Sequence, residues 1–403
     1  MKHDDVDQVF TCLAEHESRL HEIIRSLIKK PTGNPPGDTS EAAETVASLL
    51  SSMGFKVELV KAAKTKINVI AEWYTGQHET ILFNGHLDTV PIGDATVWRF
   101  DPYSATVSGG WMYGRGVADD KGAVGCVIAA CEGIRSLGLP PKANILIHAV
   151  CDEEVGSALG TSYLVKKGYA EKATRGYVME ASTSKNRIFL RNSMKGTAVL
   201  KITVKGQPAH AANPYDGINA NLEMSKVLLA LSRVRFKCKR SRYLTPPTIA
   251  PGTMVQGGDK SNVIPGESVS LSDIRYLPGM TEQTMRRDID GAIKRMRRND
   301  KNLRLSYELE LGEHKAIEIG TDQPVLRKAR DMITRVTGYK PRVMGGYGAT
   351  DASHLVLDAH VPTLIGLGPA DINLANMHGV NERVSTARLL DYTKIYAGLI
   401  LNP

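Results

Sequence analysis

The pattern of apolar and polar positions divides the first half of the chain into alternating strand-like and helix-like segments. Short apolar runs typical of strands occupy residues 56–60, 67–74, 80–84, 144–151 and 175–180. Apolar side chains recur at helical spacing over residues 6–30, 40–54, 122–137 and 160–169. Strands that alternate with helices predict an α/β sheet with helices on both faces. The functional groups of such a sheet gather at the carboxyl ends of its strands.

A different pattern begins after residue 190. Three segments alternate apolar and polar side chains, as strands with one solvated face do, and they are 197–206, 268–277 and 303–312. Helical patterns at 217–234 and 281–298 lie between them. This order predicts a smaller α+β insert with about four strands in an antiparallel sheet.

The last part of the chain returns to the first pattern, with a helix at 324–338 and a strand at 361–368. We therefore predict a first domain that is made of two pieces, residues 1–193 and 313–403, and an inserted domain at 194–312.

The composition narrows the class of protein. A chain of 403 residues is too long for one ordinary core, which agrees with two domains. No apolar run approaches the roughly 20 residues that a membrane span requires, and the acidic start MKHDDVDQVF does not resemble a signal peptide. Five scattered cysteines indicate reduced thiols. We expect a cytoplasmic protein that does not enter a membrane.

The net charge of +8 raises the question of nucleic-acid binding. Basic side chains are concentrated at 233–242 and 285–300, and neither segment carries a nucleic-acid motif. The second segment is typical of an amphipathic helix with a solvated basic face and an inward face of Ile289, Ala292, Ile293 and Met296. We favour this interpretation and expect no nucleic-acid partner, while attraction of anionic substrates stays open.

Candidate chemistry follows the strand at 80–84, in the sequence Gly85-His86-Leu87-Asp88. In an extended segment residues i and i+2 share one side, so the imidazole and the carboxylate can meet. A metal-bound imidazole commonly has a carboxylate on its second nitrogen. By itself the triplet favours a surface or hydrogen-bonded histidine over a metal ligand.

Four further positions carry candidate ligands, each at the end of a strand or in a loop. Asp119 and Asp120 precede a helix, where capping is the simpler explanation. Asp152, Glu153 and Glu154 follow a buried strand, where three carboxylates repel one another unless cations or protons offset them. The other two positions are Glu180, at the end of a strand, and His378, ahead of the final helix.

Taken together, these side chains indicate a metal centre. Two imidazoles and three carboxylates suit a pair of divalent ions such as zinc, with one carboxylate between them. These five side chains are His86, Asp119, Glu154, Glu180 and His378. One carboxylate is left over to handle protons.

The motifs that carry this chemistry resemble the M20 metallopeptidase and amidohydrolase family, which includes acetylornithine deacetylase, succinyl-diaminopimelate desuccinylase, aminoacylase-1 and glutamate carboxypeptidase. The resemblance runs in order through NGHLDTVP, MYGRGVADDKG, DEEVGS, VME, KGQPAHAANP, GGYGATDAS and MHGVNERV. It implies a zinc-exopeptidase-like α/β domain with a mixed, mostly parallel sheet. The insert would be a lid and dimerisation domain with a four-stranded antiparallel sheet.

The resemblance also implies a role for each candidate. His86 and Glu180 would hold one metal, Glu154 and His378 would hold the other, and Asp119 would bridge them. Glu153 would be the general acid/base, and Asp88 would orient His86. The peptide bond after Asp119 is expected to be cis.

In the lid, the resemblance implies that His210 reaches the partner subunit's site and helps to hold the oxyanion. Positions implied to bind substrate are Asn262, Arg275, Gly346 and Thr350. From the residues alone, His210 is a loop histidine, and Arg275 fits a structural salt bridge equally well. Two departures from relatives affect specificity: Met194 stands where desuccinylases carry an arginine, and Tyr347 is bulkier than the usual residue.

The expected function is therefore a metal-dependent amidohydrolase that uses two divalent ions, zinc with manganese or cobalt as alternatives. We expect it to deacylate an N-acyl amino acid or a related small molecule. A dipeptidase or glutamate-type carboxypeptidase is the alternative within the family, and a non-catalytic binding protein that retains the fold is the alternative of another class.

Overall fold

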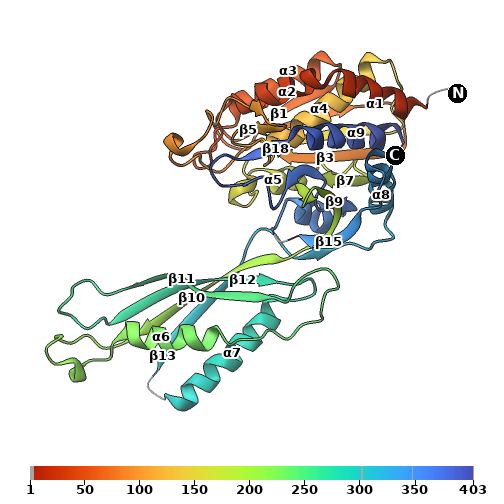
Figure 1. Ribbon diagram of the computed structural model, residues 1–403. Coiled ribbons are helices and arrows are strands. Elements are labelled where there is room, and N and C mark those ends of the chain that lie inside the picture. The colour runs from red at the N-terminus through yellow and green to blue at the C-terminus, as the bar shows by residue number, and fades with distance from the viewer. Residues whose placement is uncertain (1–3, 301–302, 347, 403) are drawn as a thin grey trace. The chain divides into compact units, whose positions relative to one another are not determined.

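The computed structural model describes residues 4–300, 303–346 and 348–402, which form two compact units. The first unit comprises the chain up to Ser193, Glu318–Gly346, and the chain from Thr350 onward. The second unit is Met194–Ile317, an insert within the first, together with Gly348 and Ala349. Figure 1 draws both units and labels many of their helices and strands.

A six-stranded sheet forms the centre of the first unit. Its strands in spatial order are β1 (Lys56–Lys61), β2 (Ile67–Trp73), β6 (Asn144–Val150), β3 (Thr80–His86), β7 (Arg175–Val178) and β16 (Thr363–Leu364). Only β2 runs against the other five of these strands. The predicted α/β class with a mixed, mostly parallel sheet is confirmed.

Strand β3 shows how helices come to cover both faces of this sheet. Ile81 and Phe83 point to one face, where they belong to the same apolar core as α4 (Lys121–Ser136) and α9 (Thr386–Leu401). On the other face, the Asn84 side chain donates to Thr161 Oγ1 at the start of α5 (Thr161–Lys166). Every residue of β3 is buried, and Ile81, Leu82 and Phe83 form its apolar middle.

The remaining helices of the first unit are α1 (Asp5–Glu15), α2 (Glu17–Ile28), α3 (Ser40–Ser52) and α8 (Pro324–Thr337). The helical region predicted over residues 6–30 is divided at His16, whose φ of −110° and ψ of 31° are not helical. Two smaller sheets complete the unit. They comprise β14 (Ile317–Glu318), β9 (Arg187–Met194), β8 (Ala181–Ser184), β17 (Gly368–Asp371) and β15 (Arg342–Gly346), and β18 (Arg383–Ser385), β5 (Trp111–Tyr113) and β4 (Thr106–Ser108).

The second unit is an antiparallel sheet with two helices. The strand order is β11 (Thr248–Gly257), β12 (Glu267–Tyr276), β10 (Gly196–Lys205) and β13 (Arg304–Leu311). Buried and more exposed residues alternate along β10 and β12, and the buried set shares a core with α6 (Ala220–Leu231) and α7 (Glu282–Asn299). The predicted four-stranded antiparallel sheet is confirmed.

Among the helices of the described ranges, none is both long enough and apolar enough to cross a membrane.

Candidate metal centre

Three neighbouring parallel strands deliver the candidate ligands to one edge of the central sheet. His86 is the last residue of β3, which lies between β6 and β7. Glu153 and Glu154 follow β6, and Glu180 follows β7. The carboxyl ends of parallel strands meet at the same edge, so side chains far apart in the sequence come together there.

Two connections complete the set. Asp119 lies in the loop ahead of α4, and the peptide bond between Asp119 and Asp120 is cis, as predicted. His378 lies between β17 and β18, with a φ of 64°. Gly85 allows the Asp120 carboxylate to approach β3, because a Cβ at Gly85 would lie 2.6 Å from Asp120 Oδ2.

The first group of ligands is centred on His86. Its Nε2 atom lies 2.9 Å from Asp119 Oδ1 and 3.6 Å from Glu180 Oε1. The His86 side chain is only 2% exposed. These three side chains offer atoms that all lie within 4.8 Å of one another.

The second group shares Asp119 with the first. His378 Nε2 lies 3.2 Å from Asp119 Oδ2 and 3.3 Å from Glu154 Oε2. Each oxygen of Asp119 thus faces a different imidazole. A zinc ion with ligand bonds of about 2.1 Å separates neighbouring ligand atoms by about 3.4 Å in a tetrahedron. The ligand atoms observed here lie 2.9–3.6 Å apart, which is compatible with a metal ion between them.

The neighbouring carboxylates raise the pKa of both imidazoles. Hydrogen bonds to Asp119 and Glu154 raise the pKa of His378 to about 10. Burial lowers the pKa of His86, but hydrogen bonds to Asp119, Asp88 and Glu180 outweigh it, so the pKa stands well above its usual value. Burial raises the pKa of Asp119, yet its bonds from both imidazoles outweigh burial and lower it.

Glu153 lies beside these ligands. Burial and the neighbouring charge of Glu180 raise the pKa of Glu153 well above its usual value. Its backbone N–H donates to Asp88 Oδ1 at 3.0 Å, and the N–H of Glu154 donates to Asp88 Oδ2 at 3.3 Å. Asp88 therefore fixes the turn that carries both glutamates.

The contact between Asp88 and His86 differs from the simple expectation. His86 Nδ1 lies 2.9 Å from the backbone carbonyl oxygen of Asp88 but 3.6 Å from its carboxylate Oδ1. The carboxylate instead accepts from Asn34 Nδ2 at 2.8 Å as well as from the two N–H groups. The carbonyl is thus the nearer partner of the ligand's second nitrogen.

A comparison with protein families identifies the family of this chain. The model of "Peptidase family M20/M25/M40" matches residues 82–402, a span that contains all five candidate ligands. The chain belongs to this family. It is an M20-family metallohydrolase that acts on carbon–nitrogen bonds.

Two curated relatives match this M20 chain over nearly its whole length. One is N-formyl-4-amino-5-aminomethyl-2-methylpyrimidine deformylase of Bacillus subtilis (strain 168), 25% identical, with 96% of this chain and 95% of the relative covered. The other is succinyl-diaminopimelate desuccinylase of Magnetococcus marinus, 26% identical, with 94% and 96% covered.

Solved structures share the fold. The M20 family metallo-carboxypeptidase Sso-CP2 of Sulfolobus solfataricus is 18% identical with a TM-score of 0.79, covering 95% of this chain and 98% of its own. The YXEP protein of Bacillus subtilis, described as a dinuclear metal binding peptidase from the M20 family, is 16% identical with a TM-score of 0.71, covering 96% and 98%.

The predicted substrate-binding residues are divided between the two units of this M20 chain. Thr350 is buried in the first unit, and its hydroxyl donates to the carbonyl of Ile365. Asn262 and Arg275 lie in the second unit, where Arg275 Nε lies 2.9 Å from Asp273 Oδ1. His210, also in the second unit, is exposed on a loop, and its Nδ1 accepts from the N–H of Ala212.

The two positions that depart from relatives have different outcomes. Met194 is buried at the end of β9, and Lys195 beside it donates to the carbonyl of Pro246. Tyr347 lies outside the described residues.

Two residues near the centre were not assigned a role from the sequence. Arg191 is buried in β9, where a Cβ at Gly346 would lie 2.2 Å from its Nη2 atom, so Gly346 makes room for this guanidinium. Asp351 accepts hydrogen bonds from Ser157 and Thr161, which follow the turn of Glu153. Asp351 stands in the motif GGYGATDAS, which was the only signal for it.

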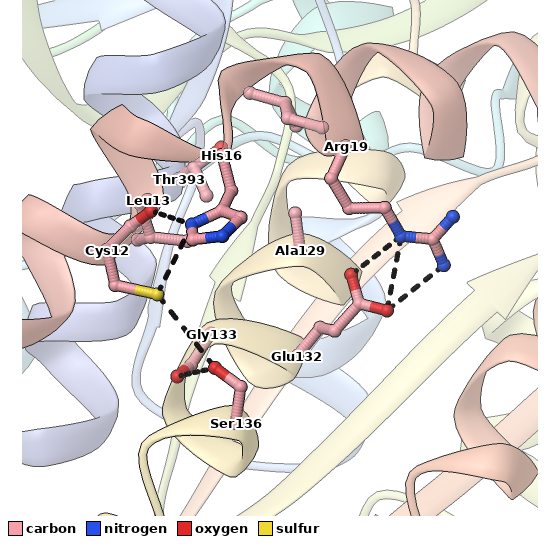
Figure 2. A pocket seen from close by; sticks show the side chains of 10 residues that line it. Cys12, Leu13, His16, Arg19, Ala129, Glu132, Gly133, Ser136 and Thr393 are labelled. Carbon is pink, nitrogen blue, oxygen red and sulfur yellow. Dashed lines mark hydrogen bonds and ion pairs between the residues drawn. The ribbon is translucent and has the colours of Figure 1, made fainter.

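A cavity of about 300 Å³ lies elsewhere in the first unit, where α1 ends and α2 begins against α4 (Figure 2). Its lining near Gly133 is 13 residues along α4 from Asp120, or about 20 Å at the helical rise. Arg19 pairs with Glu132, and His16 Nδ1 lies 2.8 Å from the carbonyl of Cys12. These polar groups are paired with one another, and the cavity is separate from the metal centre.

Proposed function

We propose that this protein is a two-metal hydrolase that removes an acyl group from an N-acyl amino acid or a related small molecule. His86 and Glu180 would hold one ion and Glu154 and His378 the other, with Asp119 shared between the two positions. The observation that carries the proposal is the position of Asp119, whose two oxygens lie 2.9 and 3.2 Å from two different imidazoles.

The ions, when bound, polarise the substrate carbonyl and make a water a better nucleophile. Glu153 accepts the proton of the attacking water at its carboxylate and then delivers that proton to the leaving amine. Burial raises the pKa of Glu153, and nearby cations oppose this because they favour the ionised form. The two effects act in opposite directions on the same carboxyl, which suits a group that must both accept and release a proton.

An acyl group is favoured over a peptide because both curated relatives carry names of acyl-removing enzymes, a deformylase and a desuccinylase. Met194, which replaces the arginine expected in desuccinylases, speaks against a succinyl group. Arg275 and Asn262 in the second unit, with Gly346 and Thr350 in the first, are our candidates for binding the rest of the substrate.

Zinc is the proposed metal, with manganese and cobalt as alternatives. Imidazole and carboxylate ligands of this number suit all three ions, and zinc is typical of tetrahedral sites of this kind. The described cysteines are free thiols, which supports the cytoplasm as the compartment.

We also propose a homodimer formed through the second unit. Strand β11 stands at the edge of its sheet, with an outer row of residues that is at least partly exposed. On α6, the side chains of Leu222 and Leu229 are each 62% exposed. An open edge beside apolar side chains is a surface that a second copy can cover, and His210 would then serve the partner subunit's site.

The main experiment compares wild type with Glu153→Ala on N-formyl, N-acetyl and N-succinyl amines and on dipeptides. The variant should keep two ions per chain, while kcat falls by about 10²–10⁴-fold. Exposed Glu171→Ala, in the same unit, is the matched control and should keep full activity. A Glu153→Ala variant with normal turnover would exclude this mechanism, and activity confined to dipeptides would exclude the deacylase.

The dimer is tested by light scattering after gel filtration. Wild type should have twice the mass of the 43.9 kDa chain, and Leu222→Asp with Leu229→Asp should give the mass of one chain. Leu59→Asp, an exposed apolar position in the first unit, is the control that should leave the dimer intact. A wild-type protein with the mass of one chain would contradict the proposal.

A further inference from the structure

A buried glutamate lies four residues after the ligand His378. Glu382 is 0% exposed, and its Oε1 atom accepts from the backbone N–H groups of Gly116, Ala118 and Asp119 at 3.0, 2.9 and 3.3 Å. This single oxygen therefore binds three backbone groups of the loop that ends at Asp119.

The second oxygen of Glu382 binds a buried arginine of the same loop. Arg115 is 2% exposed, and its Nη1 lies 2.5 Å from Glu382 Oε2. Its Nη2 atom donates to the carbonyls of His378 and Gly379, at 3.4 and 3.1 Å, and to that of Pro91 at 3.3 Å. Arg115 thus links its own loop to the segment at Pro91 and to the loop of His378.

The Arg115 guanidinium also lies over an aromatic ring, that of Trp98. The centre of the Arg115 guanidinium lies 5.3 Å from the centroid of the Trp98 ring. A planar fork with five donors can reach several acceptors and stack on a ring at once, which an ammonium group cannot do. The residue type is therefore matched to the contacts that it makes.

The two imidazole ligands differ in how they are supported. His86 ends a strand inside the central sheet and is 2% exposed at its side chain, whereas the His378 side chain is 56% exposed. His378 also has a φ of 64°, and its neighbours Asn376 and Asn381 have φ values of 53° and 58°. A loop of this kind is not fixed by regular backbone pairing, so its position depends on contacts such as those of Arg115.

We propose that Arg115 and Glu382 are positioning residues for the second metal position, the one formed by Asp119, Glu154 and His378. The pair sets the distance between the loop of Asp119 and the loop of His378. This inference rests on the proposed two-metal function and adds that the two positions depend differently on the pair. The first position, formed by His86 and Glu180 with Asp119, is fixed mainly by strand ends.

A buried ion pair is expensive to desolvate, and apolar residues of similar size often stabilise a fold equally well. The pair is explained here by what apolar residues cannot supply, namely an acceptor for three N–H groups and donors to three carbonyls. Its contacts end at the backbone of two ligands, so its effect reaches the metal through ligand geometry.

The test uses Arg115→Lys and Glu382→Gln in the full chain. Arg115→Lys keeps the charge beside Glu382 but loses the fork that reaches the carbonyls, and Glu382→Gln keeps an acceptor oxygen but loses the charge. The matched control is Arg175→Lys, because Arg175 is another buried arginine paired with a glutamate, Glu79, at the opposite end of β7 from the metal centre.

Metal affinity is measured with Mn²⁺ and Zn²⁺ by competition with a chelator, and the Mn²⁺ spectrum from electron paramagnetic resonance reports coupling between two ions. Wild type and Arg175→Lys should bind two ions and show coupling. In both test variants the second ion should bind about 10–100-fold more weakly, the value typical of lost outer contacts, and the coupled signal should disappear at equal metal concentration. The first position shares only Asp119 with the second, so the affinity for the first ion should fall by less.

The outcomes separate the two proposals. A wild type that binds a single ion would overturn the two-metal function itself. A wild type with two ions, together with variants that keep both affinities and the coupled spectrum, would overturn only the positioning role. Equal weakening of both ions would also overturn it, because the loss would then be general. If Glu382→Gln lacks the native circular-dichroism spectrum, Arg115→Lys alone decides.

Discussion

Asp88 illustrates how a residue can serve a site through both its backbone and its side chain. Its carbonyl oxygen lies nearest to His86 Nδ1, at 2.9 Å, while its carboxylate holds the N–H groups of Glu153 and Glu154. The carboxylate thus positions the acid/base residue more directly than it positions the ligand.

This division predicts the behaviour of Asp88→Asn. An asparagine keeps the carbonyl to His86 and one acceptor oxygen, but it presents an amide N–H₂ where two donors already point. We expect kcat to fall by about 10–100-fold, with little change in the affinity for the first ion. Steady-state kinetics on metal-loaded protein and chelator competition check this, and normal kcat with lost metal would contradict it.

The imidazole pKa values predict a pH dependence of metal binding. The pKa of His378 is about 10, so this ligand carries a proton at pH 7 that a metal must displace. Affinity should therefore fall as the pH falls, with release of protons on binding. Calorimetric titration in buffers of different ionisation enthalpy measures the number released, and heats that are independent of the buffer would contradict the prediction.

The raised pKa of His378 also predicts how the stability of the metal-free protein, prepared with a chelator, changes with pH. A pKa raised from 6.5 to about 10 means that the folded chain binds the His378 proton more tightly than the unfolded chain does. This stabilisation is complete below pH 6.5 and is lost as the pH rises through about 10. Denaturant unfolding across that range checks the direction.

For individual residues, the sequence was informative where the side-chain type itself indicates a metal ligand. Imidazoles and carboxylates at strand ends could be predicted as candidate ligands, and they do converge in the structure. The positioning residues Arg115 and Glu382 were not identified, although both stand inside quoted motifs, because a buried ion pair has no local pattern. Only the fold brings residues 267 positions apart into contact.

At the scale of elements, α9 shows how much of the first unit depends on one helix. Ten of its residues are buried, and the Tyr396 ring packs against Phe83 of β3 with centroids 5.4 Å apart. The helix therefore forms part of the core that supports the strand carrying His86.

Ile395→Ala should lower the free energy of unfolding by about 2–5 kcal/mol, because it leaves a cavity in a fully buried layer. The half-buried Lys394→Ala, at the preceding position of the same helix, should change the free energy of unfolding by less than about 1 kcal/mol. Urea unfolding measured by circular dichroism compares the two variants, and equal losses would show that burial is not the cause.

Elements with strong periodicity were predictable and elements without it were not. Strand β11 was missed because Pro251 and Gly252 interrupt it, at a bulge between Ala250 and Met254. Strand β8 has the sequence ASTS and β17 has GPAD, and neither shows an apolar alternation. Such strands are set by tertiary pairing, which a local pattern cannot contain.

At the scale of the whole molecule, each unit has its own apolar core. The core of the first unit is built around the central sheet, and that of the second around β10, β12, α6 and α7. Residues Ile289, Ala292 and Ile293 of α7 are buried there, and Met296 packs at its margin, as the helical pattern predicted. Separate cores predict separate losses of stability.

Ile289→Ala should therefore destabilise the second unit by about 2–5 kcal/mol without weakening either ion. Hydrogen exchange read by mass spectrometry should speed up in peptides of α7 and β10 and stay unchanged in those of β3 and α4. Faster exchange in β3, or weaker metal binding, would show that the two cores act as one.

The insertion of the second unit into the first has a consequence for the order in which the protein is made. The ribosome produces β3, β6 and β7 first, then the whole second unit, and only afterwards α9, whose Leu389, Tyr392 and Tyr396 close the core around those strands. The inserted unit is thus able to fold while the surrounding unit is still incomplete. During that interval the apolar face of the sheet that α9 will cover is exposed. Exposed apolar surface of this kind is what chaperones bind on a nascent chain.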